Sequence, residues 1–138
     1  MSTLIRNGQI ADDGWQWIDA GEAQLAARLK AGGRFVLPLA AWLTHRASLD
    51  PASAGVWLGP DDEPEAVLPW LADIPLIAIR FPVFTDGRGY SLARLLRTRH
   101  GYTGELRAVG DVLRDQLYFL QRCGFDAFQL RADQSPEE

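Results

Sequence analysis

Apolar runs of strand length alternate along the chain with segments of helical character. The strand-like runs are residues 35–37, 56–58, 77–81, 106–109 and 125–130. The helical segments between and after them are residues 39–47, 65–72, 92–100 and 112–123. Such alternation is typical of right-handed βαβ units, in which helices connect parallel strands. The pattern therefore predicts a single α/β domain with a mainly parallel sheet of about five strands.

Residues with strong positional preferences mark the ends of the predicted helices. Pro64 suits the first position of a helix, and Ser91 suits an N-cap. Asp111 precedes the last helical segment, while Gly101 and Gly124 are placed to end helices. A complete eight-fold (β/α) barrel needs roughly 250 residues. The chain is shorter, so we expect an open sheet or a half-barrel fragment that pairs with another copy.

The first residues predict a β-hairpin. Asn7 and Gly8 suit the positive backbone dihedrals of a two-residue turn. Residues 15–18 form a possible second ribbon segment, and Asp19 with Glu22 resembles the capping box of a helix. We therefore expect three segments along the chain: a hairpin extension over residues 1–18, the α/β domain over residues 19–132, and a disordered acidic tail over residues 133–138.

Composition narrows the class of protein. The chain has 138 residues, of which 47% are hydrophobic and 23% charged, which is the profile of a folded globular domain. The single cysteine, Cys123, excludes an internal disulfide and a paired-thiol redox motif. We expect it to be a buried packing residue. No apolar run approaches the roughly 20 residues of a membrane helix, and the start lacks a signal peptide. We expect a cytoplasmic protein without a membrane partner.

Positive charge is concentrated in the second half of the chain. Residues 80–131 contain nine arginines and five acidic residues, although the whole chain has a net charge of -4. Arginine forms forked contacts with carboxylates, phosphates and sulfur oxyanions, so an acidic partner or an anionic ligand is one interpretation. The alternative is that these arginines lie on solvated helix faces and pair with Glu105, Asp111 and Asp115. The acidic total disfavours nucleic-acid binding.

The loop after the third predicted strand is the richest candidate site. In an open parallel sheet, ligands bind beyond the carboxyl ends of the strands. The candidate anion-binding residues are Asp86, Gly87, Arg88, Gly89, Tyr90, Ser91, Asp111 and Arg131. Glycines allow close approach of a ligand, and free N–H groups at a helix start attract an anion. Alternatively, the two glycines only shape a tight turn. The pattern GxGxxL departs from the dinucleotide fingerprint GxGxxG.

Other chemical signals are weak. His45 and His100 are isolated from further metal-ligating residues, so we expect no metal site. The tryptophans all fall in the first half of the chain, and we expect them to be core or interface residues. No residue stands out as catalytic, and no cofactor-binding motif is present.

The stretches DGRGYS, GELRAVGDVL and RCGFDAF carry a family resemblance. Together with looser similarity upstream, they make residues 34–131 resemble the bacterial family called domain of unknown function 934. Proteins of this family are described as oxidoreductases of sulfite reduction, and they are commonly encoded beside the sulfite or nitrite reductase haemoprotein. The oxidoreductase description finds little support in the residues, because no ligand set for flavin, nicotinamide, iron–sulfur cluster or sirohaem is recognisable.

The resemblance and the residues together lead to three hypotheses. The first is an accessory protein of assimilatory sulfite reduction, without redox activity of its own, that docks on the reductase haemoprotein or another sulfate-assimilation enzyme. The second is a small enzyme or sensor that binds a sulfur oxyanion or a phosphorylated sulfur metabolite at the DGRGYS loop, with Arg88 as the anion clamp and Asp111 as acid or base. The third is a structural role as a homodimer.

Overall fold

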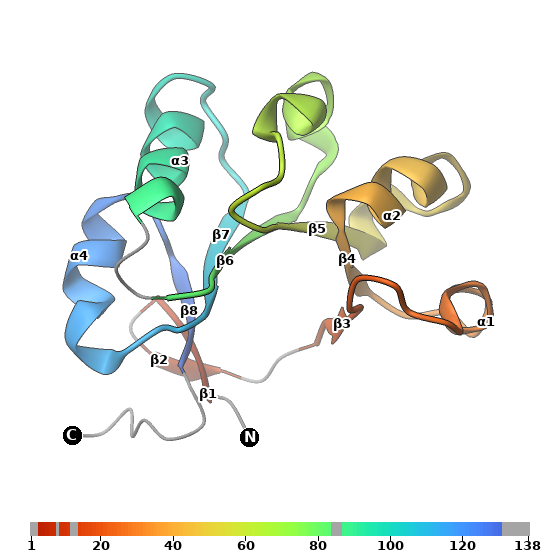
Figure 1. Ribbon diagram of the computed structural model, residues 1–138, viewed down its shortest axis with the longest axis horizontal. Helices are drawn as coiled ribbons and strands as arrows, with labels where there is room; N and C mark the ends of the chain where they lie inside the picture. Colours follow the sequence, from red (N-terminus) through yellow and green to blue (C-terminus); the bar gives the residue numbers. More distant parts are fainter. Residues whose placement is uncertain (1–2, 8, 12–13, 84–86, 131–138) are drawn as a thin grey trace.

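The computed structural model describes residues 3–7, 9–11, 14–83 and 87–130, and Figure 1 shows their arrangement. The strands are β1 (Thr3–Arg6), β2 (Gln9–Ala11), β3 (Gln16–Trp17), β4 (Phe35–Pro38), β5 (Ala54–Leu58), β6 (Leu76–Phe81), β7 (Glu105–Gly110) and β8 (Ala127–Leu130). The α-helices are α1 (Leu25–Lys30), α2 (Leu39–His45), α3 (Gly87–Thr98) and α4 (Leu117–Arg122). Short 3-10 segments are η1 (Arg46–Ser48), η2 (Pro51–Ser53), η3 (Pro64–Asp73) and η4 (Arg114–Gln116). In this part of the chain no helix is long and apolar enough to cross a membrane.

All eight strands form one sheet in the order β2-β1-β8-β7-β6-β5-β4-β3. Every neighbouring pair from β3 to β8 is parallel, so the α/β prediction of a mainly parallel sheet is confirmed. The parallel part has six strands where the pattern predicted about five. The additional strand is β3, whose two residues pair with Phe35 and Val36 of β4 at the sheet edge. Residues 15–18 therefore do contain a strand, as expected, but it pairs parallel with β4 and does not form a ribbon with the hairpin.

The predicted hairpin at the start of the chain is present. Asn7 has a positive φ of 53°, as the turn requires, and β1 pairs antiparallel with β2. The strand β1 also pairs antiparallel with β8, so the hairpin extends the parallel sheet at the edge opposite β3. The predicted acidic tail, residues 133–138, lies outside the described residues.

The connection between β2 and β3 forces the sheet to curl. These strands lie at opposite edges, yet only four residues separate Ala11 from Gln16. An extended chain covers at most about 18 Å over this separation. The edges of a flat sheet of eight strands would be about 34 Å apart. The sheet therefore bends until its two edges approach each other, and Figure 1 shows the helices outside this curve.

The curled sheet has two different faces. The outer face packs against α2, η3, α3 and α4, and its core includes Trp42, Val67, Leu96 and Leu120 from these segments. The inner face carries a second cluster, formed by Trp15, Trp17, Val36, Trp57, Leu76, Ala78 and Val109, without any helix residue. Because consecutive parallel strands are neighbours in the sheet, right-handed crossovers place every helix on the same face. The inner face is covered by the curl of the sheet itself.

Charged side chains also occupy the inner face, near the amino ends of the parallel strands. The side chain of Arg107 is 1% exposed, and its Nη2 lies 2.9 Å from Oε2 of Glu105. The other oxygen of Glu105 accepts a hydrogen bond of 2.8 Å from Nε of Arg6. The carboxylate thus compensates two guanidinium groups, one of them buried. The expectation that Glu105 pairs with arginines is confirmed.

The helix boundaries differ from the predicted ones at several places, of which three concern predicted helix starts. The helix α3 begins at Gly87, so Ser91 lies inside it and is not the N-cap. The helix α1 begins at Leu25 after Gln24, so Asp19 and Glu22 do not form its capping box. The last predicted helix is shortened to α4 because the 3-10 turn η4 precedes it.

Gly110 connects the end of β7 to the segment that follows. Its φ is +93°, and a Cβ atom at this position would lie 2.4 Å from the carbonyl oxygen of Phe81. A side chain here would therefore combine backbone strain with a clash against the backbone of β6. Gly101 also has a positive φ, of 65°, but has open space around it, while Gly87 has open space and no positive φ.

We expect Gly110→Ala to lower the free energy of unfolding by about 3 kcal/mol, because strain and clash both act. Gly101→Ala should cost about 1 kcal/mol through strain alone. Gly87→Ala should change stability by less than about 1 kcal/mol. Denaturant unfolding of the three variants measures this ranking, and equal losses at positions 110 and 101 would contradict the close contact with Phe81.

Candidate functional site

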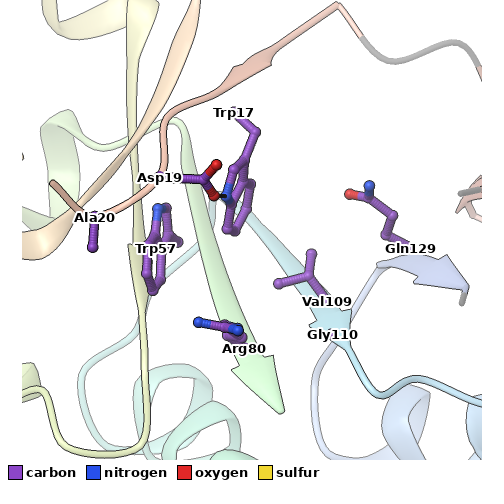
Figure 2. A pocket seen from close by; sticks show the side chains of 8 residues that line it. All are labelled: Trp17, Asp19, Ala20, Trp57, Arg80, Val109, Gly110 and Gln129. Carbon is purple, nitrogen blue, oxygen red and sulfur yellow. Dashed lines mark hydrogen bonds between the residues drawn. The ribbon is translucent and has the colours of Figure 1, made fainter. Parts of the chain in front are cut away.

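Two hollows lie at the carboxyl edge of the parallel strands. The first, which we call the mouth, has a volume of about 610 Å³ and opens from the inner face. Its lining residues are Trp17, Asp19, Ala20, Trp57, Arg80, Val109, Gly110 and Gln129 (Figure 2). The second, the helix-side hollow, has a volume of about 600 Å³ and lies between the loop after β5 and the start of α3. Both volumes are in the range of small-molecule sites.

Two stacked tryptophans form one wall of the mouth. The ring centroids of Trp17 and Trp57 are 5.2 Å apart, with an angle of 17° between the ring planes. The Trp57 indole N–H donates to the carbonyl of Ile18 over 2.8 Å, and the Trp17 indole N–H donates to Asp19 Oδ1 over 3.2 Å. These contacts fix both rings. The two tryptophans therefore offer ring surface to the mouth, since their N–H groups are already engaged.

Arg80 brings a positive charge to the mouth. It is the penultimate residue of β6 and follows Ala78 on the inner face, because alternate residues of a strand share a face. Its side chain is exposed, and its guanidinium carbon lies 5.8 Å from the centroid of the Trp57 ring. Among the described residues, no carboxylate forms an ion pair with Arg80. The guanidinium is thus available to a ligand.

Gln129 and Val109 lie across the mouth from the two tryptophans, as Figure 2 shows. Gln129 is half-buried in β8, on the same face as its partner Leu4 in β1. Its carboxamide has no hydrogen-bond partner within the described ranges. A carboxamide can both donate and accept hydrogen bonds. The mouth therefore combines a cation, an amide without a partner among the described residues, and an aromatic wall.

The helix-side hollow contains four of the residues singled out in the sequence: Gly87, Arg88, Gly89 and Ser91. Arg88 Nη1 donates to the carbonyl of Pro60 over 3.4 Å and lies 3.6 Å from Asp61 Oδ1. Both side chains of this ion pair are largely exposed, so it contributes little to stability. Arg88 therefore lies at the rim of the hollow, where a ligand competes with a solvated carboxylate.

Gly89 has a packing role. It is buried in α3, and a Cβ atom there would lie 2.4 Å from the ring of Phe81. The absent side chain thus lets the first turn of α3 lie on the end of β6. Sequence reasoning interpreted this glycine as part of a ligand loop or a tight turn. The structure places it inside the helix, against the core.

Tyr90 and Asp111 do not line either hollow. The Tyr90 ring packs between those of Phe81 and Phe119, at centroid distances of 4.9 and 5.0 Å, and its hydroxyl oxygen accepts a hydrogen bond from Gln116. Burial raises the pKa of Tyr90, with smaller contributions from Cys123 and from the nearby charge of Asp111. These residues connect α3 to the segment around α4. The remaining two candidates, Asp86 and Arg131, lie outside the described residues.

Other arginines of the second half hold the fold together. Arg97 donates hydrogen bonds to the carbonyls of Tyr102, Gly104 and Gly124, over 2.9, 2.7 and 2.9 Å. Arg107 is buried beside Glu105. Some of the arginines in the second half of the chain therefore stabilise the fold. Arg80 and Arg88 are the arginines that line the two hollows.

Sequence reasoning missed the mouth. Trp17, Asp19, Trp57, Arg80 and Gln129 come from four different strands or the residues after them. A usable signal was present for Arg80, since it is a charged residue at the end of an apolar strand. The tryptophans were interpreted only as core or interface residues. Among the described residues, no group of three or more histidine, cysteine or acidic side chains is placed to hold a metal ion.

Comparison with known proteins gives a family and no closer relative. A search of curated proteins found no match, and a search of solved structures found none either. Residues 55–138, which make up more than half of the chain, match the family model described as "Bacterial protein of unknown function (DUF934)". The matched region includes Trp57, Arg80 and Gln129 of the mouth and all of the helix-side hollow. The chain therefore belongs to the bacterial DUF934 family.

Proposed function

We propose that this protein binds a small molecule with an anionic group at the carboxyl edge of its sheet, with Arg80 as the anchor. The observation that carries the proposal is the position of Arg80: its guanidinium faces the mouth without an ion-pair partner among the described residues. A guanidinium fork binds carboxylate, phosphate or sulfur oxyanions through two parallel hydrogen bonds. Ligands of parallel α/β sheets bind at this edge.

The surroundings of Arg80 favour an anion. Arg80 also lines the helix-side hollow, where Arg88 adds a second guanidinium. The first N–H groups of α3, which begins at Gly87, have no partner within the helix and carry its positive dipole end. Asp19 is the acidic residue that lines the mouth, and its Oδ1 already accepts from Trp17. Asp62 also lines the helix-side hollow, where its Oδ2 accepts a hydrogen bond of 2.7 Å from the Gly59 N–H, and Asp61 pairs with Arg88. Arg80 and the start of α3 are therefore the parts of this edge that favour a negatively charged group.

Assimilatory sulfite reduction is the biological setting that we propose for this binding. The proposal rests on the family resemblance and on the chemistry of the anchor. Sulfite, sulfate and phosphorylated sulfur metabolites all present oxyanions that an arginine fork can bind. In this setting the protein is an accessory factor or a sensor that supplies no redox cofactor of its own.

Thermal unfolding in the presence of sulfite, sulfate or adenylylated sulfate tests the binding. A ligand at one hundred times its dissociation constant should stabilise the fold by about 2.7 kcal/mol, which raises Tm by about 10 °C in a domain of this size. Arg80→Ala should abolish the shift and leave Tm without ligand unchanged. Arg99→Ala, which removes an exposed arginine outside both hollows, is the matched control and should retain the shift. A flat screen, or an equal loss in both variants, would contradict the proposal.

Docking on another protein is a second candidate function, favoured by the outer surface of α4. Tyr118 and Phe119 are 72% and 51% exposed, which is unusual for adjacent large aromatic side chains. The guanidinium carbon of Arg122 lies 5.8 Å from the centroid of the Tyr118 ring. Tyrosine and arginine are enriched among the residues that dominate binding at protein interfaces. The partner proposed here is the sulfite reductase haemoprotein or another sulfate-assimilation enzyme.

Affinity capture with purified sulfite reductase tests the docking. We expect Tyr118→Ala to weaken the association at least tenfold, because truncating a central aromatic residue costs about 2 kcal/mol. Leu43→Ala, at an exposed apolar position in α2, should leave it unchanged. High salt should weaken the association through Arg122. No association at micromolar concentrations, at either salt concentration, would exclude the reductase as the partner.

A further inference from the structure

We propose that the mouth binds the planar heteroaromatic ring of a ligand whose anionic group is held by Arg80, as in a nucleoside monophosphate. The anionic part of this inference rests on the proposed function. The ring part rests on separate observations, namely the tryptophan wall, the carboxamide of Gln129, which bonds to none of the described residues, and the size of the mouth.

The tryptophan wall is suited to stacking. One face of Trp17 lies on Trp57, which is 6% exposed, so the pair is anchored in the inner-face cluster. The Trp17 N–H is directed to Asp19, which fixes the ring plane. Figure 2 shows Trp17 between Trp57 and the opposite wall, so its second face is turned toward the interior of the mouth. A planar ring stacks on such a face with a gain of about 1 to 3 kcal/mol.

The opposite wall offers hydrogen bonds at the edge of such a ring. Gln129 carries a carboxamide that makes no hydrogen bond to any described residue, although its side chain is half-buried. A glutamine amide matches the adjacent donor and acceptor of a heterocycle, as in its bidentate pairing with adenine. Val109 beside it presents an apolar surface to the same space. This wall therefore favours a heterocycle over a purely hydrocarbon ring.

An inorganic oxyanion alone does not account for these features. It would contact Arg80 and leave Gln129 and the face of Trp17 in contact with water. The volume of about 610 Å³ corresponds to an organic ligand with a ring and a charged group. In Figure 2 Arg80 lies next to Trp57, near the carboxyl end of β6, which places a charged substituent close to a ring stacked in the mouth.

The inference is tested by measuring how phosphate, adenosine, AMP and CMP bind to the full chain. Calorimetry gives the affinities, and tryptophan fluorescence reports on the ring wall. We expect AMP or CMP to bind at least tenfold more tightly than phosphate and to quench the fluorescence of Trp17. Trp17→Leu should remove this advantage and leave phosphate affinity unchanged. Arg80→Ala should weaken phosphate and both nucleotides at least tenfold, and leave adenosine binding unchanged. Leu43→Ala, at an exposed apolar residue of α2 outside the mouth, should alter none of these affinities.

The outcomes separate the two proposals. Phosphate binding through Arg80 without any preference for AMP or CMP would overturn the ring site and leave the proposed anion site standing. Adenosine binding that requires Trp17, with phosphate, AMP and CMP affinities unchanged by Arg80→Ala, would support the ring site and overturn the anion anchor. If Trp17→Leu does not fold, Gln129→Leu replaces it and should lower nucleotide affinity at least threefold with phosphate affinity unchanged. A nucleotide preference that survives the substitution would overturn the inference.

Discussion

The short connection from β2 to β3 constrains the whole molecule, because it brings together the two edges of an eight-stranded sheet. A flat sheet of this width cannot satisfy it. The curl also determines how the apolar inner face is covered. All helices lie on one face, so the other face, with Trp57 and Leu76, would be exposed in a flat sheet. Curling covers this face with its own strands, as the strands of a barrel cover its interior. The fold thus encloses an inner core without a second helical layer.

The same curl explains where charge and binding capacity are found. Toward the amino ends of the strands, the enclosed face contains Arg107, compensated by Glu105. A buried guanidinium without this carboxylate would carry a desolvation cost of several kcal/mol. Toward the carboxyl ends the strands leave space, and side chains from β3, β5, β6 and β8 converge on the mouth. At one end of the interior the charged side chains form ion pairs with each other, while at the other end Arg80 has no ion pair with any described residue.

The alternation of apolar runs and helical segments was sufficient to predict the α/β class, the parallel strands β4 to β8 and the first hairpin. These features depend on local periodicity and on turn residues such as Asn7. The position of β3 could not be predicted, because its two residues are defined only by pairing with β4, which begins at Phe35. The mouth was missed for the same reason. Trp17 and Gln129 lie more than one hundred residues apart in the sequence, and only the curl brings them to opposite walls of one space.

The glycine motif at the start of α3 illustrates how a sequence signal can have a structural cause. Gly89 is required because Phe81 occupies the space of a side chain, and Tyr90 is directed toward Phe119. Neither residue needs a ligand to explain it. Arg80 differs, because its guanidinium is exposed at the end of a buried strand, and its contact with the Trp57 ring leaves its N–H donors without a hydrogen-bond partner among the described residues. Where packing alone explains why a residue is present, no binding role has to be assumed for it. By this criterion Arg80 and the mouth that it faces are the first candidates for ligand binding at the carboxyl edge.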